Sequence, residues 1–101
     1  MLDLDRKYLA IVKKILQEHI PNTTVWAYGS RIKGTAHEGS DLDLAIINND
    51  VSISSNQLSA LRAAFSESDL PILVDILNWD DIPANFKDEI EKRHIVLQEP
   101  Q

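Results

Sequence analysis

The length of 101 residues favours a single domain over residues 1–101. The absence of cysteine excludes disulfide scaffolds, thiolate zinc sites and cysteine nucleophiles. Ten lysines and arginines against 16 aspartates and glutamates give a net charge of −6, which disfavours extensive nucleic-acid binding. Residues 1–7 are charged every few positions and lack the apolar segment of a signal peptide, and nowhere do 18 apolar residues run together. We therefore expect a soluble cytoplasmic protein without membrane association.

The first half of the chain predicts a helix and two strands. From Tyr8 to Ile20 apolar residues recur every three or four positions, which indicates an amphipathic helix with Asp5 as its N-cap. The β-branched and aromatic residues at 23–28 predict a strand that ends before a polar segment at 31–38, where we expect one or two helical turns. The apolar residues at 42–47 predict a second strand.

The second half predicts a helix, a strand and a final helix. Ser54 or Ser55 can cap a helix over the apolar spacing that ends at Phe65, and residues 72–77 form an apolar run typical of a strand. Asp80 or Asp81 before Pro83 is a usual helix start. The alternation predicts an α/β (α+β) fold, with one small β-sheet and flanking helices. The pattern leaves the strand directions open.

Three aspartates are candidate metal ligands. Asp41 and Asp43 are two apart at the start of a strand, so their side chains point to the same face. Alone, this pair is typical of a surface turn. Asp75 interrupts the third apolar run, where a lone buried carboxylate would be costly, so it either faces water on an edge strand, pairs with a cation, or binds a metal. Three carboxylates from two strands suit Mg²⁺.

A second group of residues can bind an anion. Gly29 and Ser30 follow a strand and begin a predicted helical turn, where backbone N–H groups and a hydroxyl can face a phosphate. Taken alone, Gly-Ser is ordinary turn sequence. Arg31 and Lys33, however, concentrate positive charge beside it in an otherwise acidic chain. The histidines lack the spacing of metal ligands and favour surface or helix-end roles.

Three segments together resemble the polymerase-beta-like nucleotidyltransferase superfamily. They are GSRIKG at 29–34, SDLDL at 40–44 and VDI at 74–76. Within that superfamily the chain is similar to the minimal nucleotidyltransferases, which are stand-alone subunits of two-gene systems with an all-helical second member, often of the HEPN type. The resemblance implies the polymerase-beta-like palm fold with its small mixed β-sheet.

The resemblance also implies roles for the candidate residues. Asp41 and Asp43 would bind the Mg²⁺ that bridges the nucleotide phosphates, and Asp75 would complete a second metal site or act as the base toward an acceptor hydroxyl. All three are therefore expected to be both catalytic and metal-binding.

The remaining candidates would bind the nucleotide, which is ATP or another nucleoside triphosphate. Gly29 and Ser30 would contact the β- and γ-phosphates, and Arg31 or Lys33 would offset the charge of the departing pyrophosphate. Ser40 would add a contact to a phosphate or to a metal-bound water.

The function that this implies is a Mg²⁺-dependent transfer of a nucleoside monophosphate, AMP from ATP, to a hydroxyl of a cognate helical partner. The protein would act as the antitoxin of a HEPN/MNT-type two-gene system and could form a hetero-oligomer with its partner. Two alternatives are open. The chain could be a non-catalytic binding antitoxin, or the nucleotide-binding part of a two-subunit enzyme whose helical member binds a small-molecule substrate.

Overall fold

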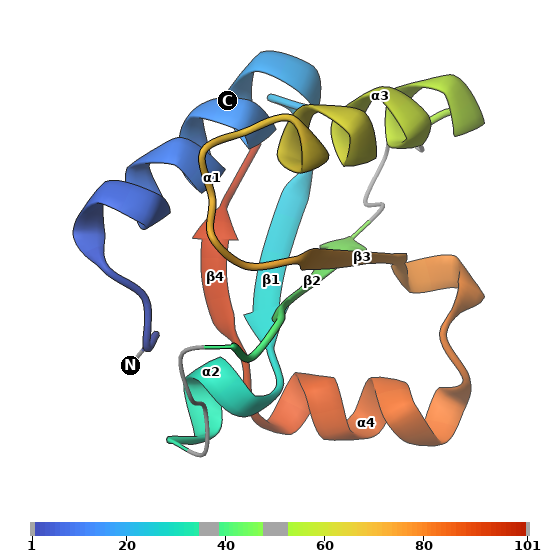
Figure 1. Cartoon of the computed structure of the whole chain (residues 1–101). Helices are drawn as coiled ribbons and strands as arrows, with labels where there is room; N and C mark the ends of the chain where they lie inside the picture. Colours follow the sequence, from blue (N-terminus) through green and yellow to red (C-terminus); the bar gives the residue numbers. More distant parts are fainter. Residues whose placement is uncertain (1, 35–38, 48–52, 101) are drawn as a thin grey trace.

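In the computed structural model, residues 2–34, 39–47 and 53–100 are described, and they form one sheet with helices on both faces (Figure 1). In chain order the elements are α1 (Arg6–His19), β1 (Thr24–Tyr28), α2 (Ser30–Lys33), β2 (Leu42–Ile47), α3 (Ser55–Ser66), β3 (Val74–Asn78), the 3₁₀ turn η1 (Trp79–Asp81), α4 (Ala84–Lys92) and β4 (Ile95–Gln98). None of the described helices is both long and apolar enough to cross a bilayer.

The sheet is mixed, with the strand order β3-β2-β1-β4. β1 is antiparallel to both of its neighbours, β2 and β4, whereas β2 and β3 are parallel. Parallel neighbours need a crossover, and α3 supplies it. The expected α/β (α+β) class and small mixed sheet are confirmed.

The two faces of the sheet are covered by different helices. α1 and α3 lie side by side over one face, where alternate residues of β1, Val25 and Ala27, are fully buried (Figure 1). α4 packs on the other face, where the ring of Phe86 meets Tyr28 edge to face with 5.8 Å between centroids. The side chains of β1 alternate between the two layers because successive residues of a strand point to opposite faces.

The predicted helix starts are confirmed for α1 and α3. The Asp5 carboxylate accepts a hydrogen bond from the Lys7 amide, which caps α1. Ser54 caps α3 through a reciprocal pair of hydrogen bonds with Gln57, one 3.1 Å and the other 2.8 Å long. Each cap satisfies N–H groups that have no partner within the helix.

One sequence expectation near the C-terminus is confirmed and another is wrong. The helix start expected near Pro83 is found, because Asp80 and Asp81 lie in η1 and α4 begins at Ala84 with Pro83 as its N-cap. The chain does not end with a helix, however, because β4 follows α4 and pairs with β1. Four residues are too short for a strand period to stand out, and β4 is defined by tertiary pairing. The Gln98 amide extends that pairing by donating to the carbonyls of Ile20 and Thr23, at 2.7 and 2.8 Å.

Candidate active site

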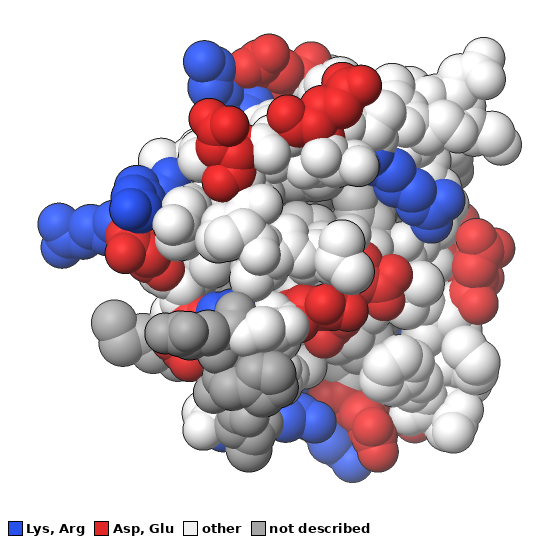
Figure 2. All heavy atoms as spheres, viewed as in Figure 1, with Lys and Arg blue, Asp and Glu red and all other residues white. Residues whose placement is uncertain are grey.

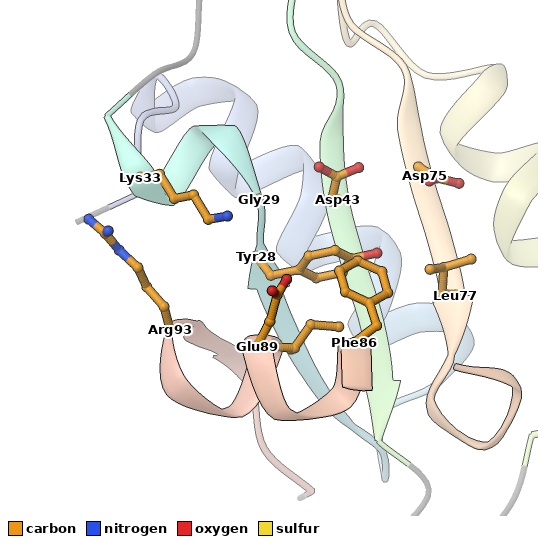
Figure 3. Close-up of a pocket in the computed structure, with 10 residues that line it drawn as sticks. Tyr28, Gly29, Lys33, Asp43, Asp75, Leu77, Phe86, Glu89 and Arg93 are labelled. Carbon is orange, nitrogen blue, oxygen red and sulfur yellow. The ribbon is translucent and has the colours of Figure 1, made fainter. Parts of the chain in front are cut away.

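The site begins with a row of three residues across the sheet. In the register of the strands, Tyr28 of β1 is paired with Asp43 of β2, and Asp43 is paired with Asp75 of β3. Paired residues on neighbouring strands point to the same face. The fold therefore brings together two carboxylates that are 32 positions apart in the sequence, beside a phenol (Figure 3).

Electrostatics distinguish Asp43 from its neighbours. Its pKa is raised, first by partial burial and then by the negative charges of Asp75 and Asp41. Asp75 and Asp41 are exposed, and Asp41 directly precedes β2. Burial, followed by the charges of Asp43 and Asp75, also raises the pKa of Tyr28, so its phenol remains a neutral hydrogen-bond donor. The arrangement concentrates negative charge that a cation would stabilise.

Gly29 lets the chain turn tightly against Asp43. Its φ of 84° lies in the region that side chains disfavour, and a Cβ at this position would overlap the Asp43 carboxylate oxygen Oδ2. Gly29 is also the N-cap of α2, which starts at Ser30. The glycine is thus required twice, for the backbone conformation and for the position of a candidate ligand.

The two predicted cations have different surroundings. Arg31 is only 7% exposed. Its guanidinium donates to the Ser40 carbonyl at 3.0 and 3.1 Å and to the Asp3 carbonyl at 2.8 Å. It thereby holds the N-terminal segment and the approach to β2 against α2. Lys33 is exposed and lines the same pocket as the two strand carboxylates.

The carboxylate row opens into a pocket of about 310 Å³ between the sheet, α2 and α4. Its lining is Tyr28, Gly29, Lys33, Asp43, Asp75, Leu77, Phe86, Glu89, Ile90 and Arg93. Figure 3 shows the carboxylates of Asp43 and Asp75 on the strand side and Lys33 and Arg93 on the side of α2 and the α4 end. Ser30, Arg31, Ser40 and Asp41 are not among the lining residues.

The contribution of α4 is absent from the sequence prediction, which used this segment only for packing. Phe86, Glu89, Ile90 and Arg93 follow one another at spacings of three, one and three, so they share one face of the helix end. Glu89 and Arg93 place charge beside the apolar Phe86 and Ile90, and this mixture was the sequence signal that the helix end could line a site. Their role in a pocket depends on where α4 packs, which the local pattern does not specify.

The donor chemistry of the site fits Mg²⁺. This ion is usually held by one or two carboxylates, with waters and substrate phosphates completing its octahedral shell. Asp43 and Asp75 supply such a pair, with Asp41 close enough to affect the pKa of Asp43. Within the described residues, no three side chains of the His, Cys, Asp or Glu type already form a ready-made metal cluster. Substrate phosphates and solvent would complete the shell of a bound ion.

Charge on the molecular surface is mixed. Figure 2 shows acidic side chains across the viewed face, with basic ones separated among them and no continuous basic stripe over its described atoms. The positive charge at the pocket is local to Lys33 and Arg93. A small anion could be neutralised there.

The chain belongs to the polymerase beta nucleotidyltransferase family, because the model of that family, "Polymerase beta, Nucleotidyltransferase", matches residues 11–101. It is similar to the "Probable protein adenylyltransferase MntA" of Haemophilus influenzae, with 48% identity over 99% of this chain and 87% of the relative. These similarities identify the chain as a minimal nucleotidyltransferase, an enzyme class that the sequence motifs predicted.

Two solved structures share the fold. "Crystal structure of the toxin-antitoxin with AMP-PNP" matches with a TM-score of 0.73 and 21% identity, over 92% of this chain and 74% of that one. "Crystal structure the toxin-antitoxin MntA-HpeT mutant-D39ED41E" matches with a TM-score of 0.72 and 19% identity, over 97% and 76%. The expected polymerase-beta-like fold is thereby confirmed.

Proposed function

We propose that this protein transfers AMP from ATP to a hydroxyl of a cognate helical partner, in a Mg²⁺-dependent reaction that makes it the antitoxin of a two-gene system. The observation that carries the proposal is the pairing of Asp43 with Asp75 beside Gly29, at the wall of a pocket with two cations on its other side. The similarity to a probable protein adenylyltransferase of Haemophilus influenzae supports the reaction class. The toxin-antitoxin complex with AMP-PNP that shares this fold supports a nucleotide substrate and an antitoxin role. The ATP and partner that it requires would place it in the cytoplasm.

The metal is assigned to the aspartates. Asp41, Asp43 and Asp75 would hold Mg²⁺, and when bound the ion supplies charge neutralisation and orientation of the nucleotide phosphates. The raised pKa of Asp43 supports this assignment, because after burial the charges of Asp75 and Asp41 raise it, so the three carboxylates interact. A cation among them would reverse this effect and favour the ionised form of Asp43.

The phosphates are assigned to the turn before α2. Gly29 leaves room for close approach, and the Ser30 hydroxyl and the Lys33 ammonium would bind the β- and γ-phosphates. Ser40 would add a contact to a phosphate or to a metal-bound water. Arg31 would support these contacts indirectly. Its guanidinium donates to the carbonyls of Ser40 and Asp3, so it would hold the backbone near the phosphates in position.

The chemical step is a displacement at the α-phosphorus. The acceptor oxygen forms a bond to phosphorus, the bond to the β-phosphate oxygen breaks, and pyrophosphate leaves. Asp75, exposed at the edge strand β3, would either complete the metal site or take the proton of the acceptor hydroxyl. The acceptor would approach from this edge, and an all-helical partner of the HEPN type would bring it there as part of a hetero-oligomer.

Intact-mass spectrometry tests the proposal. The protein is co-expressed with its candidate helical partner and incubated with ATP and Mg²⁺, in parallel with the Asp41→Asn, Asp43→Asn double variant and with Asp69→Asn as an exposed acidic control. We expect the partner mass to rise by one AMP with wild type and with the control, and to stay unchanged with the double variant. A stable complex without any adduct would instead favour a binding antitoxin or a two-subunit enzyme with a diffusible acceptor.

A further inference from the structure

We infer that Arg93 binds the β- and γ-phosphates of the nucleotide and later the departing pyrophosphate, so that the leaving group is held between α2 and the end of α4. This inference rests on the proposed function and adds a residue outside the three sequence motifs. Arg93 directly follows α4 and lines the pocket together with Lys33 of α2 (Figure 3). Two cations from distant parts of the chain therefore converge on one side of the site.

Both cations are available to a ligand. Within the described part of the chain, neither the Lys33 ammonium nor the Arg93 guanidinium takes part in a hydrogen bond or an ion pair. Arg31 differs sharply, because its guanidinium is buried and donates to two carbonyl groups. An exposed guanidinium presents a planar fork of N–H donors that matches two phosphate oxygens at once. Arg93 is thus the arginine of this site that can bind an anion without breaking the fold.

The negative charge of the pocket lining favours a second cation at the phosphates. Asp43, Asp75 and Glu89 contribute three carboxylates to the lining, against the two cations. Without Arg93, a triphosphate entering between Glu89 and Asp43 would meet three negative charges and only Lys33 as a positive one. Mg²⁺ would offset the strand carboxylates but not Glu89, which is on α4. Arg93 directly follows α4 and lines the same pocket as Glu89, so its positive charge can offset the charge of Glu89 there.

Arg93 could also have a purely structural role, since a cation at a helix C-terminus interacts favourably with the helix dipole. Lys92 provides a matched control for this role. It is the last residue of α4, carries the same charge and is exposed, but it does not line the pocket. Arg93→Ala and Lys92→Ala therefore both remove a cation from the helix end, and only the first removes one from the site.

Equilibrium binding of ATP, AMP and pyrophosphate to wild type, Arg93→Ala and Lys92→Ala, with MgCl₂ present, tests the inference. The loss of a charge-assisted contact should raise the Kd for ATP and for pyrophosphate by about tenfold to 100-fold in Arg93→Ala. The Kd for AMP should change by less than about threefold, because AMP lacks the β- and γ-phosphates. Lys92→Ala should leave all three values within about twofold. The Kd of Arg93→Lys for ATP and pyrophosphate should lie between the values for wild type and Arg93→Ala, because lysine keeps the charge but lacks the planar guanidinium fork.

Two results would overturn the inference while leaving the proposed function in place. In the first, Arg93→Ala binds ATP as tightly as Lys92→Ala does. In the second, Arg93→Ala weakens AMP binding as strongly as ATP binding, which would assign Arg93 to the nucleoside or to general folding. Thermal unfolding of each variant identifies a general folding defect. If wild type bound neither ATP nor pyrophosphate, the proposed function would fail together with the inference. Normal ATP binding and transfer by both alanine variants would remove only the role of Arg93.

Discussion

Asp43 and Asp75 are register partners on the parallel strands β2 and β3, so two carboxylates are adjacent on one face of the sheet. No described lysine or arginine side chain forms a hydrogen bond or an ion pair with either of them. Such a pair destabilises the folded chain, because like charges repel and Asp43 is partly buried. The fold thus concentrates negative charge where the proposed Mg²⁺ would bind.

Replacing Asp43 with asparagine should stabilise the protein at neutral pH. The pKa of Asp43 is raised in the folded state, so the folded chain holds this proton more tightly than the unfolded chain does. The free energy of unfolding consequently falls as pH rises through the interval from the ordinary pKa to the raised one. We expect Asp43→Asn to increase Tm by a few degrees at pH 7 and to have no effect below both pKa values.

Thermal melts of wild type and Asp43→Asn without divalent metal, from pH 3 to pH 8, measure this difference. The exposed Asp69→Asn is the control, and its Tm should follow wild type across the range. A lower Tm for Asp43→Asn at pH 7 would show that the carboxylate is stabilising in the folded protein, contrary to the cause assigned here.

Adding Mg²⁺ should stabilise wild type through the same carboxylates. At an ion concentration about ten times Kd, preferential binding to the folded state contributes about 1.4 kcal/mol. This corresponds to a rise in Tm of about 5–10 °C for a domain of this size. The double variant Asp43→Asn, Asp75→Asn should show less than a quarter of that shift, measured against NaCl at equal ionic strength. Equal shifts in both proteins would place the ion elsewhere.

Gly29 and Gly34 separate backbone strain from steric overlap. Both have a positive φ, 84° and 78°, but a Cβ at Gly29 would overlap Asp43 whereas one at Gly34 would meet nothing within 4 Å. Each alanine variant should lose about 1 kcal/mol of unfolding free energy from backbone strain. Gly29→Ala should lose more and should also abolish the Mg²⁺-dependent shift in Tm, because the Asp43 carboxylate must move.

Urea unfolding with and without Mg²⁺ compares the two glycine variants. Gly34→Ala should keep the metal response of wild type, which makes it the matched control for strain. If the two variants lost stability and metal response to the same extent, the contact between Gly29 and Asp43 would have no special role.

Arg31 and Lys33 should separate in their effects. Arg31→Lys removes the planar fork that donates to Ser40 and Asp3, so it should lower the free energy of unfolding by about 1–3 kcal/mol. The exposed Lys33→Ala should change stability by less than about 0.5 kcal/mol. ATP binding should show the opposite order, with Lys33→Ala weakening it more than Arg31→Lys, because Lys33 lines the pocket. Urea unfolding and equilibrium ATP binding, measured on the same samples, would contradict these roles if Arg31→Lys weakened ATP more than Lys33→Ala.

The sequence alone was sufficient for the parts of this protein that depend on local chemistry. The apolar spacing before Ile20 and the cap at Asp5 predict α1, because a helix satisfies its own backbone and needs one apolar face. The three sequence motifs predict the family, since phosphate transfer needs a glycine turn and paired carboxylates at short range. Each of these features is encoded within a short stretch of sequence.

Tertiary structure alone decided the parts that depend on partners far along the chain. The pairing of Asp43 with Asp75 is set by the parallel register of β2 and β3, and the four-residue strand β4 exists because β1 has an open edge. Arg31 and Arg93 look alike in sequence, yet packing buries the first and leaves the second at the pocket. Residue type determines which chemistry is possible, but long-range packing determines which groups meet, because it depends on contacts that no local pattern contains.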